Sequence, residues 1–327
     1  MNIKKLEQWY IENHRKLPFR ESNDPYQIWI SEIMLQQTQM DTVIPYFNRF
    51  LKTFPSVCLL AKASEEELLI HIQGLGYYRR FKNMLKAAKV IVKEYAGVFP
   101  KTHKEILKLP GIGEYTAGAI MSIAYNKPFH ATDGNVIRVL SRYYLNTKNM
   151  RIEKNKKAIK LCNQKLIEKS TPSIYTQAIM ELGALVCKPK KPLCKACPIQ
   201  SGCLAHERNQ VIHVPYLSKA KKKRTTHYKV LLIDDGQSIY LRKRTETLLG
   251  GMYEFPMVEN NEKLPINYEI IEALDPVKHV FTHLVWQMSV YRVKLKQSPP
   301  QSWIKVKKDM LYQFPMATAH KKIADQL

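Results

Sequence analysis

The stretch Leu109-Pro110-Gly111-Ile112-Gly113 decides the fold that we predict for this chain. Two glycines one residue apart, after a proline and before a helix-forming run, make a turn whose backbone amides lie open at a helix N-terminus. Thr102 and Glu105 form a capping-box pattern upstream, so residues 102–125 are predicted to be helix, glycine hairpin, helix. Such a hairpin can bind a phosphate. An ordinary αα-turn with a glycine stop is the alternative.

The length and net charge of the chain limit the functions that it can have. Its 327 residues suffice for two or three domains, and 52 Lys plus Arg against 28 Asp plus Glu leave a net charge of +24. This excess predicts a polyanion partner, because neutralising phosphates releases counterions. The start of the chain has no apolar segment of signal-peptide length, and no run of about 18 apolar residues occurs. We therefore expect a cytoplasmic protein with no membrane partner, associated with the nucleoid in a prokaryote.

Helical periodicity extends to about residue 210. The predicted helices cover residues 4–17, 26–38, 41–54, 64–72, 81–95, 153–170 and 173–186. In the second of them Ile28, Glu32 and Leu35 share one face. Burial there would raise the pKa of the Glu32 carboxyl, as a general acid near neutral pH requires. A solvated surface charge is the alternative.

A short loop interrupts the helices at Gly74-Leu75-Gly76-Tyr77-Tyr78-Arg79-Arg80. An apolar, aromatic tip followed by two arginines can wedge into a base stack while the cations hold the backbone. Two half-buried tyrosines beside exposed arginines would give the same pattern. The loop is therefore a candidate DNA-contacting element, and its composition leaves both interpretations open.

Four cysteines end the helical region with the spacing C-x6-C-x2-C-x5-C: Cys187, Cys194, Cys197 and Cys203. In a reducing compartment clustered cysteines are more often metal ligands than disulfides. Four thiolates this close can hold tetrahedral zinc or a four-iron cluster, and the spacing alone does not decide between them.

A basic linker and a second domain follow. Between residues 182 and 233 the only acidic residue is Glu207, and residues 216–226, which include Lys221, lack any apolar period. We predict an interdomain linker that also touches DNA, with a solvated hinge as the alternative.

After the linker, the sequence pattern changes from helices to strands. A hairpin is expected over 229–233 and 238–243 around Asp235-Gly236, alternating apolar residues over 277–295, and a closing helix over 316–327.

These motifs resemble the endonuclease III superfamily of DNA base-excision glycosylases and, over nearly the whole chain, its adenine-specific (MutY) family. Ser31-Glu32-Ile33-Met34-Leu35-Gln36-Gln37-Thr38 matches that family's catalytic-glutamate motif, Asp133-Gly134-Asn135 its catalytic-aspartate motif, and the cysteine spacing its 4Fe-4S loop. Gly250 to Pro256 is similar to a Nudix-type fold. The glutamate-rich metal helix of Nudix hydrolases has no counterpart in 258–268, so this domain is expected to bind rather than hydrolyse.

The resemblance implies a fold with three parts. Residues 1–215 would be an all-α helix-hairpin-helix glycosylase core with the cluster loop at 187–203. Residues 216–226 would be the basic linker, and 227–327 an α+β Nudix-like domain that recognises the lesion. The cofactor would be one 4Fe-4S cluster, and the partner double-stranded DNA with A:8-oxoG or A:G mispairs, bound by a monomer.

The resemblance also implies a monofunctional adenine glycosylase. Glu32 would protonate adenine at N7. Asp133, near a helix start with Asn135 behind it, is predicted to have a lowered pKa and to stabilise the oxocarbenium-like sugar as an anion. Tyr115 stands where the endonuclease III enzymes place a Schiff-base lysine, so a lyase mechanism loses its nucleophile.

Further roles follow from the same resemblance. Around the lesion and the DNA backbone we expect Gln37, Thr38, Tyr77, Gly111 and Gly113; in the adenine pocket Arg20 and Gln177; and in the lesion sensor Phe281, Thr282 and His283. The family commonly has Trp in place of Phe19 and Ser in place of Thr282. An endonuclease III-like glycosylase/lyase for oxidised pyrimidines and a non-enzymatic, cluster-bearing DNA-binding protein remain the alternatives.

Overall fold

The computed structural model describes residues 1–219, 222–262 and 266–327. They form two compact units, one of residues 1–62 with 86–219 and one of 63–85 with 220–327. Lys221 and the centre of the predicted linker lie outside the described residues. In the part of the chain that the structure describes, no helix is both long and apolar enough to cross a membrane.

The first unit is helical. Its elements are α1 (Ile3–Asn13), η1 (Pro18–Arg20), α2 (Pro25–Leu35), α3 (Met40–Thr53), α4 (Val57–Lys62), α7 (His103–Lys108), α8 (Glu114–Ala119), η2 (Ile120–Ala124), α9 (Gly134–Tyr143), α10 (Glu153–Ile167), α11 (Pro172–Leu185), η3 (Cys194–Ala196) and α12 (Leu204–Glu207). Helix α6 (Arg79–Glu94) belongs to both units, and α5 (Glu65–Ile72) to the second. Large buried side chains such as Trp29, Phe47 and Tyr175 fill the helical core.

Helices α1 and α2 end earlier than their periodicity predicts. Helix α1 stops at Asn13, where the His14 side chain and backbone both bond to the Tyr10 carbonyl. Helix α2 stops at Leu35, because the next residues turn sharply and Gln37 has a left-handed φ of 57°. The starts follow the predicted chemistry better, since Ser64 forms a complete capping box on α5 and Thr102 caps α7.

The glycine hairpin joins α7 to α8. Gly111 has a φ of +78°, which favours glycine, whereas Gly113 is extended and caps α8 with open space where a Cβ would stand. Helix α8 passes into a π-helical turn, η2. Gly118 of α8 lies against a loop, with its missing Cβ position 2.1 Å from the His130 carbonyl oxygen.

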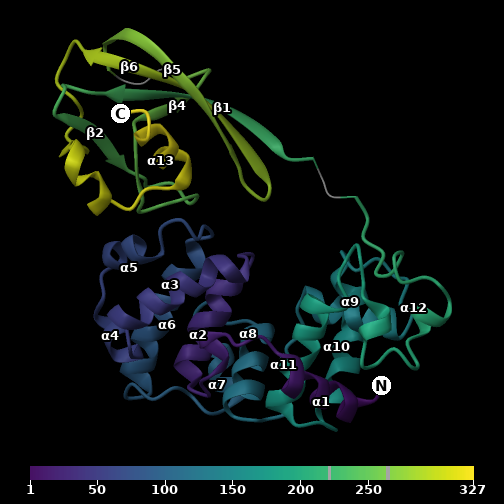
Figure 1. The fold of residues 1–327 in the computed structure, drawn as a ribbon. Coiled ribbons are helices and arrows are strands. Elements are labelled where there is room, and N and C mark those ends of the chain that lie inside the picture. Colours follow the sequence, from purple (N-terminus) through teal and green to yellow (C-terminus); the bar gives the residue numbers. More distant parts are fainter. Residues whose placement is uncertain (220–221, 263–265) are drawn as a thin grey trace. The chain divides into compact units, whose positions relative to one another are not determined.

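The second unit contains two sheets. One has the order β4 (Met257–Glu259), β1 (Arg224–Ile233), β6 (Leu284–Leu295), β5 (Tyr268–Val280); the other has the order β3 (Tyr253–Glu254), β2 (Ser238–Lys243), β7 (Trp303–Lys307). Strands β1 and β6 are parallel and all other pairs antiparallel. Two further elements complete the domain, η4 (Lys308–Gln313) and α13 (Thr318–Ala324), and α13 lies against the strands in Figure 1.

The predicted hairpin of the C-terminal domain is wrong in one respect. The Asp235 turn forms, with its side chain accepting from the Ser238 backbone N–H at 2.8 Å. Beyond the single bridge between Asp234 and Ile239, however, β1 and β2 diverge into different sheets. The parallel pairing of β1 with β6 takes the edge that a hairpin partner would occupy, a long-range choice that the local pattern does not reveal. Strand β1 also begins at Arg224, within the predicted linker.

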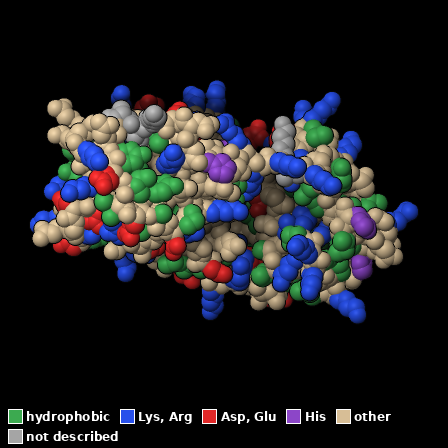
Figure 2. All heavy atoms as spheres, turned by 90° about the horizontal axis from the view of Figure 1, so that it is seen from above, with side chains coloured by type: hydrophobic (Ala, Val, Ile, Leu, Met, Phe, Trp, Pro, Cys, Tyr) green, Lys and Arg blue, Asp and Glu red, His purple; other side chains and the backbone are tan. Residues whose placement is uncertain are grey.

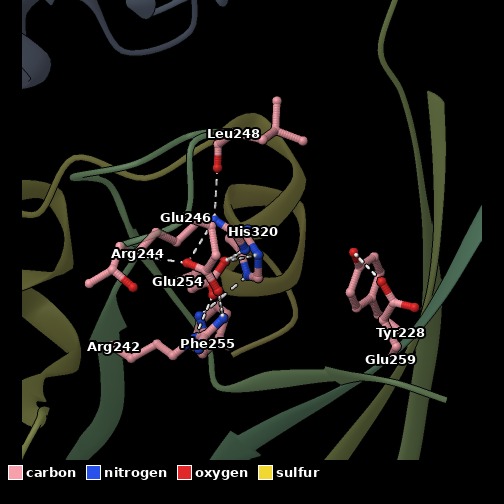
Figure 3. A network of polar contacts seen from close by, with 10 residues as sticks. Tyr228, Arg242, Arg244, Glu246, Leu248, Glu254, Phe255, Glu259 and His320 are labelled. Carbon is pink, nitrogen blue, oxygen red and sulfur yellow. Dashed lines mark hydrogen bonds and ion pairs between the residues drawn. The ribbon is translucent and has the colours of Figure 1, made fainter. Parts of the chain in front are cut away.

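A buried ion network holds the second sheet to α13 (Figure 3). The carboxylate of Glu254 is fully buried and accepts from Arg242 at 2.6 Å and from Arg244 at 2.5 Å. His320 of α13 accepts the Phe255 backbone N–H at Nδ1, and its Nε2 lies 3.4 Å from Glu254. Burial alone would raise the pKa of Glu254, but His320 and the arginines lower it below its usual range.

Lys and Arg side chains project across the face of the molecule shown in Figure 2. This distribution follows from the net charge of +24. A protein surface with this field attracts polyanions and repels other cationic surfaces.

Candidate active site

One cavity of 690 Å³ lies within the helical unit and collects most of the predicted site residues. Those lining it are Arg20, Glu32, Gln37, Thr38, Gly111, Gly113, Tyr115, Asp133, Asn135 and Gln177. They come from η1, α2 and the turn after it, the glycine hairpin, the start of α9, and α11. Ile28, Met180 and Phe19 add apolar wall, which suits the flat face of a base.

Glu32 is buried in this cavity, with 8% of its surface exposed. The Tyr115 hydroxyl donates to its Oε2 at 2.6 Å. Burial raises the pKa of the Glu32 carboxyl, the bond from Tyr115 opposes this, and the charge of Asp133 raises it further. Burial and two nearby carboxylates raise the pKa of Tyr115 well above its usual value, so it remains a neutral donor. The direction predicted for Glu32 agrees with this environment.

Asp133 is the N-cap of α9. Its Oδ1 accepts the Val136 backbone N–H at 2.7 Å, and its Oδ2 accepts from Asn135 Nδ2 at 2.8 Å. The predicted lowering of its pKa is wrong, because burial raises the pKa of Asp133 by more than the hydrogen bonds and Arg138 lower it. Asp133 nevertheless has several partners that favour its anion, and its charge disfavours the anion of Glu32. The surroundings therefore favour the anion of Asp133 and disfavour the anion of Glu32.

Sequence reasoning missed Glu181, which is fully buried beside the cavity. It accepts from Arg15 Nε and from Arg20 Nη1, each at 2.7 Å. Burial alone would raise the pKa of Glu181, but the two guanidinium groups lower it to about 2. This ion pair fixes Arg20 at the cavity wall. Glu181 could have been found from the sequence, because it is a lone glutamate within the apolar segment 178–185, and the same pattern led to Glu32.

The four cysteines lie together in a loop that α9 anchors. Burial raises the pKa of the Cys197 thiol to about 12, and the other three cysteines add to the increase. Arg142 is 2% exposed and donates to Cys187 Sγ at 3.3 Å and to the Lys188 carbonyl at 2.8 Å. Arg138 donates to the Cys187 carbonyl and to Asn135 Oδ1, both at 2.8 Å, which links the loop to the cavity.

Zinc and a 4Fe-4S cluster require different arrangements of the four cysteine sulfurs. In the described residues, no three side chains of His, Cys, Asp or Glu are close enough to hold a single ion. Tetrahedral zinc would need its four sulfurs about 2.3 Å from one centre. A 4Fe-4S cluster would bind one thiolate at each of its four irons, so its ligands are farther apart. Four cysteines close enough to raise the pKa of Cys197, with Arg142 donating to Cys187 Sγ, are compatible with that donor set.

The remaining predicted residues lie in the second unit. Tyr77 has a left-handed φ of 50° and contacts the Thr282 hydroxyl through its own. The Phe281 ring packs edge-on against Trp286 at 4.9 Å and so anchors the segment to the domain core. Thr282 and His283 are exposed. The loop at 74–80 and the segment at 281–283 thus meet through two hydroxyl groups.

Comparison with known proteins decides the family. Residues 30–168 match the model of the HhH-GPD superfamily of base excision DNA repair proteins, and 228–326 match that of the NUDIX domain. An adenine DNA glycosylase of Buchnera aphidicola subsp. Baizongia pistaciae is 38% identical over 84% of this chain and 81% of its own length. The chain belongs to the adenine DNA glycosylase family. The adenine DNA glycosylase of Mus musculus is 31% identical over 89% of the chain and 70% of its own length.

Among solved structures, a thermostable thymine-DNA glycosylase matches the helical part. It is 28% identical with a TM-score of 0.57 and covers 63% of this chain and 95% of its own. The predicted fold class, a helix-hairpin-helix core followed by a Nudix-like domain, is confirmed. So is the resemblance to the adenine glycosylases. The chain is therefore a DNA glycosylase of base-excision repair, which excludes a non-enzymatic DNA-binding protein.

Proposed function

We propose that this glycosylase removes adenine mispaired with 8-oxoguanine, or with guanine, from duplex DNA. The observation that carries the proposal is a pair of carboxylates, buried Glu32 and half-buried Asp133, that line the same cavity of 690 Å³. Adenine must leave the duplex to reach them, at a cost of a few kcal/mol that is smaller at a mispair. The glycine hairpin and the basic surface supply the DNA affinity.

Glu32 is the general acid in this mechanism. Because Tyr115 donates to Oε2, the proton of the neutral carboxyl resides on Oε1, which is the oxygen assigned to adenine N7. Protonation makes adenine a better leaving group, and the bond between its N9 and the sugar C1′ then breaks. The electron pair of that bond leaves with the base.

Asp133 stabilises the positive charge that develops on the sugar. The donors that favour the anion of Asp133, and the negative charge of Asp133 beside Glu32, support this division of roles. Water then adds at C1′ and gives up a proton, which leaves an abasic site. Tyr115 offers no amine for a Schiff base, so we infer that the strand stays intact. Arg20 and Gln177 line the pocket for the base, and Asn135 holds Asp133.

We further propose that Cys187, Cys194, Cys197 and Cys203 hold one 4Fe-4S cluster. When bound, the cluster supplies a rigid loop rather than reaction chemistry. Arg138 and Arg142 of α9 would connect that loop to Asn135 and so to the cavity. Tyr77 with Gln37 and Thr38 would surround the oxidised base, and Phe281, Thr282 and His283 would sense it. We place this activity in a monomer in the cytoplasm, at the nucleoid in a prokaryote.

The test compares Glu32→Gln and Asp133→Asn with the unchanged protein. Each substitution keeps the shape and removes the acid or the anion, so we expect single-turnover adenine release from an A:8-oxoG duplex to be abolished while mispair binding persists. A variant that kept a near-normal rate would remove its residue from the mechanism. Tyr115→Lys should introduce some alkali-independent strand nicking, and thymine glycol duplexes test the rival specificity for oxidised pyrimidines.

A further inference from the structure

The loop that delivers Asp133 to the cavity lies outside any regular element. Residues 126–133 form neither helix nor strand. Gln164 of α10 donates to the Pro128 carbonyl at 2.7 Å and accepts the His130 backbone N–H at 3.2 Å. From the other side, Gly118 of α8 abuts the His130 carbonyl. The position of this loop is therefore set by helices on both sides of it.

Asn163 of α10 makes the innermost contacts with this loop. It is 1% exposed, and its Nδ2 donates to the Ala131 carbonyl at 3.2 Å and to Thr132 Oγ1 at 2.9 Å. Its Oδ1 accepts from the hydroxyl of Tyr175, which is also 1% exposed, at 2.8 Å. Such a buried amide is costly unless paired, and here both its nitrogen and its oxygen are used.

The bonds continue from Asn163 toward the surface. Thr132 Oγ1 lies 3.0 Å from His130 Nδ1. Tyr175, Asn163, Thr132 and His130 thus form one connected set that joins α11 and α10 to the residues just before Asp133. Hydrogen bonds are directional, so they define the position of the Ala131 and Thr132 backbone more narrowly than apolar packing would.

We propose that Asn163 is a positioning residue for Asp133. It does not line the cavity, so it acts through the backbone of Ala131 and Thr132 rather than on the substrate. The inference rests on the proposed role of Asp133, whose carboxylate must stand beside the sugar when charge develops there. Misplacing a reacting group by about 1 Å can cost on the order of a hundredfold in rate.

The test measures adenine release and DNA binding separately. For Asn163→Ala we expect single-turnover release to be about 10- to 100-fold slower. The Kd for a duplex with a non-hydrolysable 2′-fluoro-deoxyadenosine should be unchanged, because the DNA-contacting groups are untouched. The matched control is Asn155→Ala. Asn155 is also on α10 and also bonds a backbone carbonyl, that of Asn149, at 3.0 Å, but it lies away from the loop.

Two further variants keep the test informative if Asn163→Ala does not fold. Thr132→Val preserves shape but leaves an Asn163 N–H unpaired, so it should slow release several-fold, whereas Thr132→Ser keeps the acceptor and should keep most of the rate. A folded Asn163→Ala or Thr132→Val protein with the unchanged rate would overturn the proposal, as would an equal loss of DNA affinity. If Asp133→Asn itself retained the rate, the proposed function would fail instead.

Discussion

Glu32 is buried and Asp133 is half-buried in the same cavity, and the groups around each carboxyl suit it to a different proposed role. Among the described residues, Glu32 has one hydrogen-bond donor, Tyr115, while burial and the charge of Asp133 raise its pKa. Asp133 has a helix N-terminus, an amide and a nearby guanidinium, which favour its anion even though burial raises its pKa. The two residues therefore differ in the number of donors around each carboxyl.

The bond from Tyr115 predicts a pH effect. It favours the charged form of Glu32, so Tyr115→Phe should raise the pKa of Glu32 further. Because the general acid must be protonated, the rate falls as pH rises through this pKa, and the falling limb should move to higher pH in the variant. Single-turnover rates across pH measure this. Tyr125→Phe is the control, since the Tyr125 hydroxyl bonds only a backbone carbonyl; a limb that stayed or moved lower would contradict the prediction.

Local sequence patterns predicted the surroundings of some of these carboxyl groups correctly and those of others wrongly. The helical wheel placed Glu32 among apolar side chains because helix geometry depends only on nearby sequence. The predicted direction of the Asp133 pKa is wrong, because Asp133 lies in a cavity lined by residues of α2, the glycine hairpin and α11, which are distant from it in sequence. Glu181 was missed for the related reason that its arginine partners lie more than 160 residues away.

At the scale of elements, caps were predictable and strand partners were not. Ser64 and Thr102 bond to their own helices, so a few residues decide the outcome. Strand β1 instead chooses between a nearby partner and β6, about 60 residues on, and the parallel pairing with β6 prevails. The contact of Gly118 with the His130 carbonyl, from a loop 12 residues later in the chain, is likewise tertiary and not visible in the local pattern.

Gly118→Ala should therefore be destabilising. A Cβ 2.1 Å from the His130 carbonyl oxygen cannot be accommodated without moving the loop before Asp133. Overpacking of this kind costs about 1–3 kcal/mol. Thermal or urea unfolding gives the loss of stability, and adenine release should slow as well. Gly134→Ala is the control, because no atom lies within 4 Å of its Cβ position; equal stability of both variants would show that the loop yields freely.

The proposed cluster in the cysteine loop predicts the metal content of the purified protein. The protein purified without oxygen should be yellow-brown and contain about four irons per chain. Cys197→Ser should lose iron and solubility together, since Cys197 is one of the four proposed ligands. Cys58→Ser should retain the iron, because Cys58 is an exposed cysteine outside the loop. Zinc in place of iron in the unchanged protein would refute the proposed cluster.

At the scale of the molecule, the chemistry and the proposed reading of the lesion belong to separate units. All residues lining the cavity and all four cysteines precede residue 204, in the helical unit. Phe281, Thr282 and His283 belong to the other unit, which also includes the loop at 74–80. That grouping was not predictable from sequence, because the contact between Tyr77 and Thr282 joins segments 205 residues apart.

This separation predicts the outcome of a truncation. Residues 1–219 should retain adenine release but lose most of the preference for 8-oxoguanine over guanine opposite adenine, because the sensor segment and the partner of Tyr77 are removed. Discrimination by a few hydrogen bonds is worth about 1–3 kcal/mol, or roughly ten- to more than a hundredfold. Single-turnover rates on A:8-oxoG and A:G duplexes give the ratio. Thr282→Val in the full chain removes only the hydroxyl and should reduce the ratio by less. If the ratio were the same in the truncated and full-length proteins, the C-terminal domain would not recognise the lesion. Discrimination would then have to arise from Gln37 and Thr38, which line the cavity.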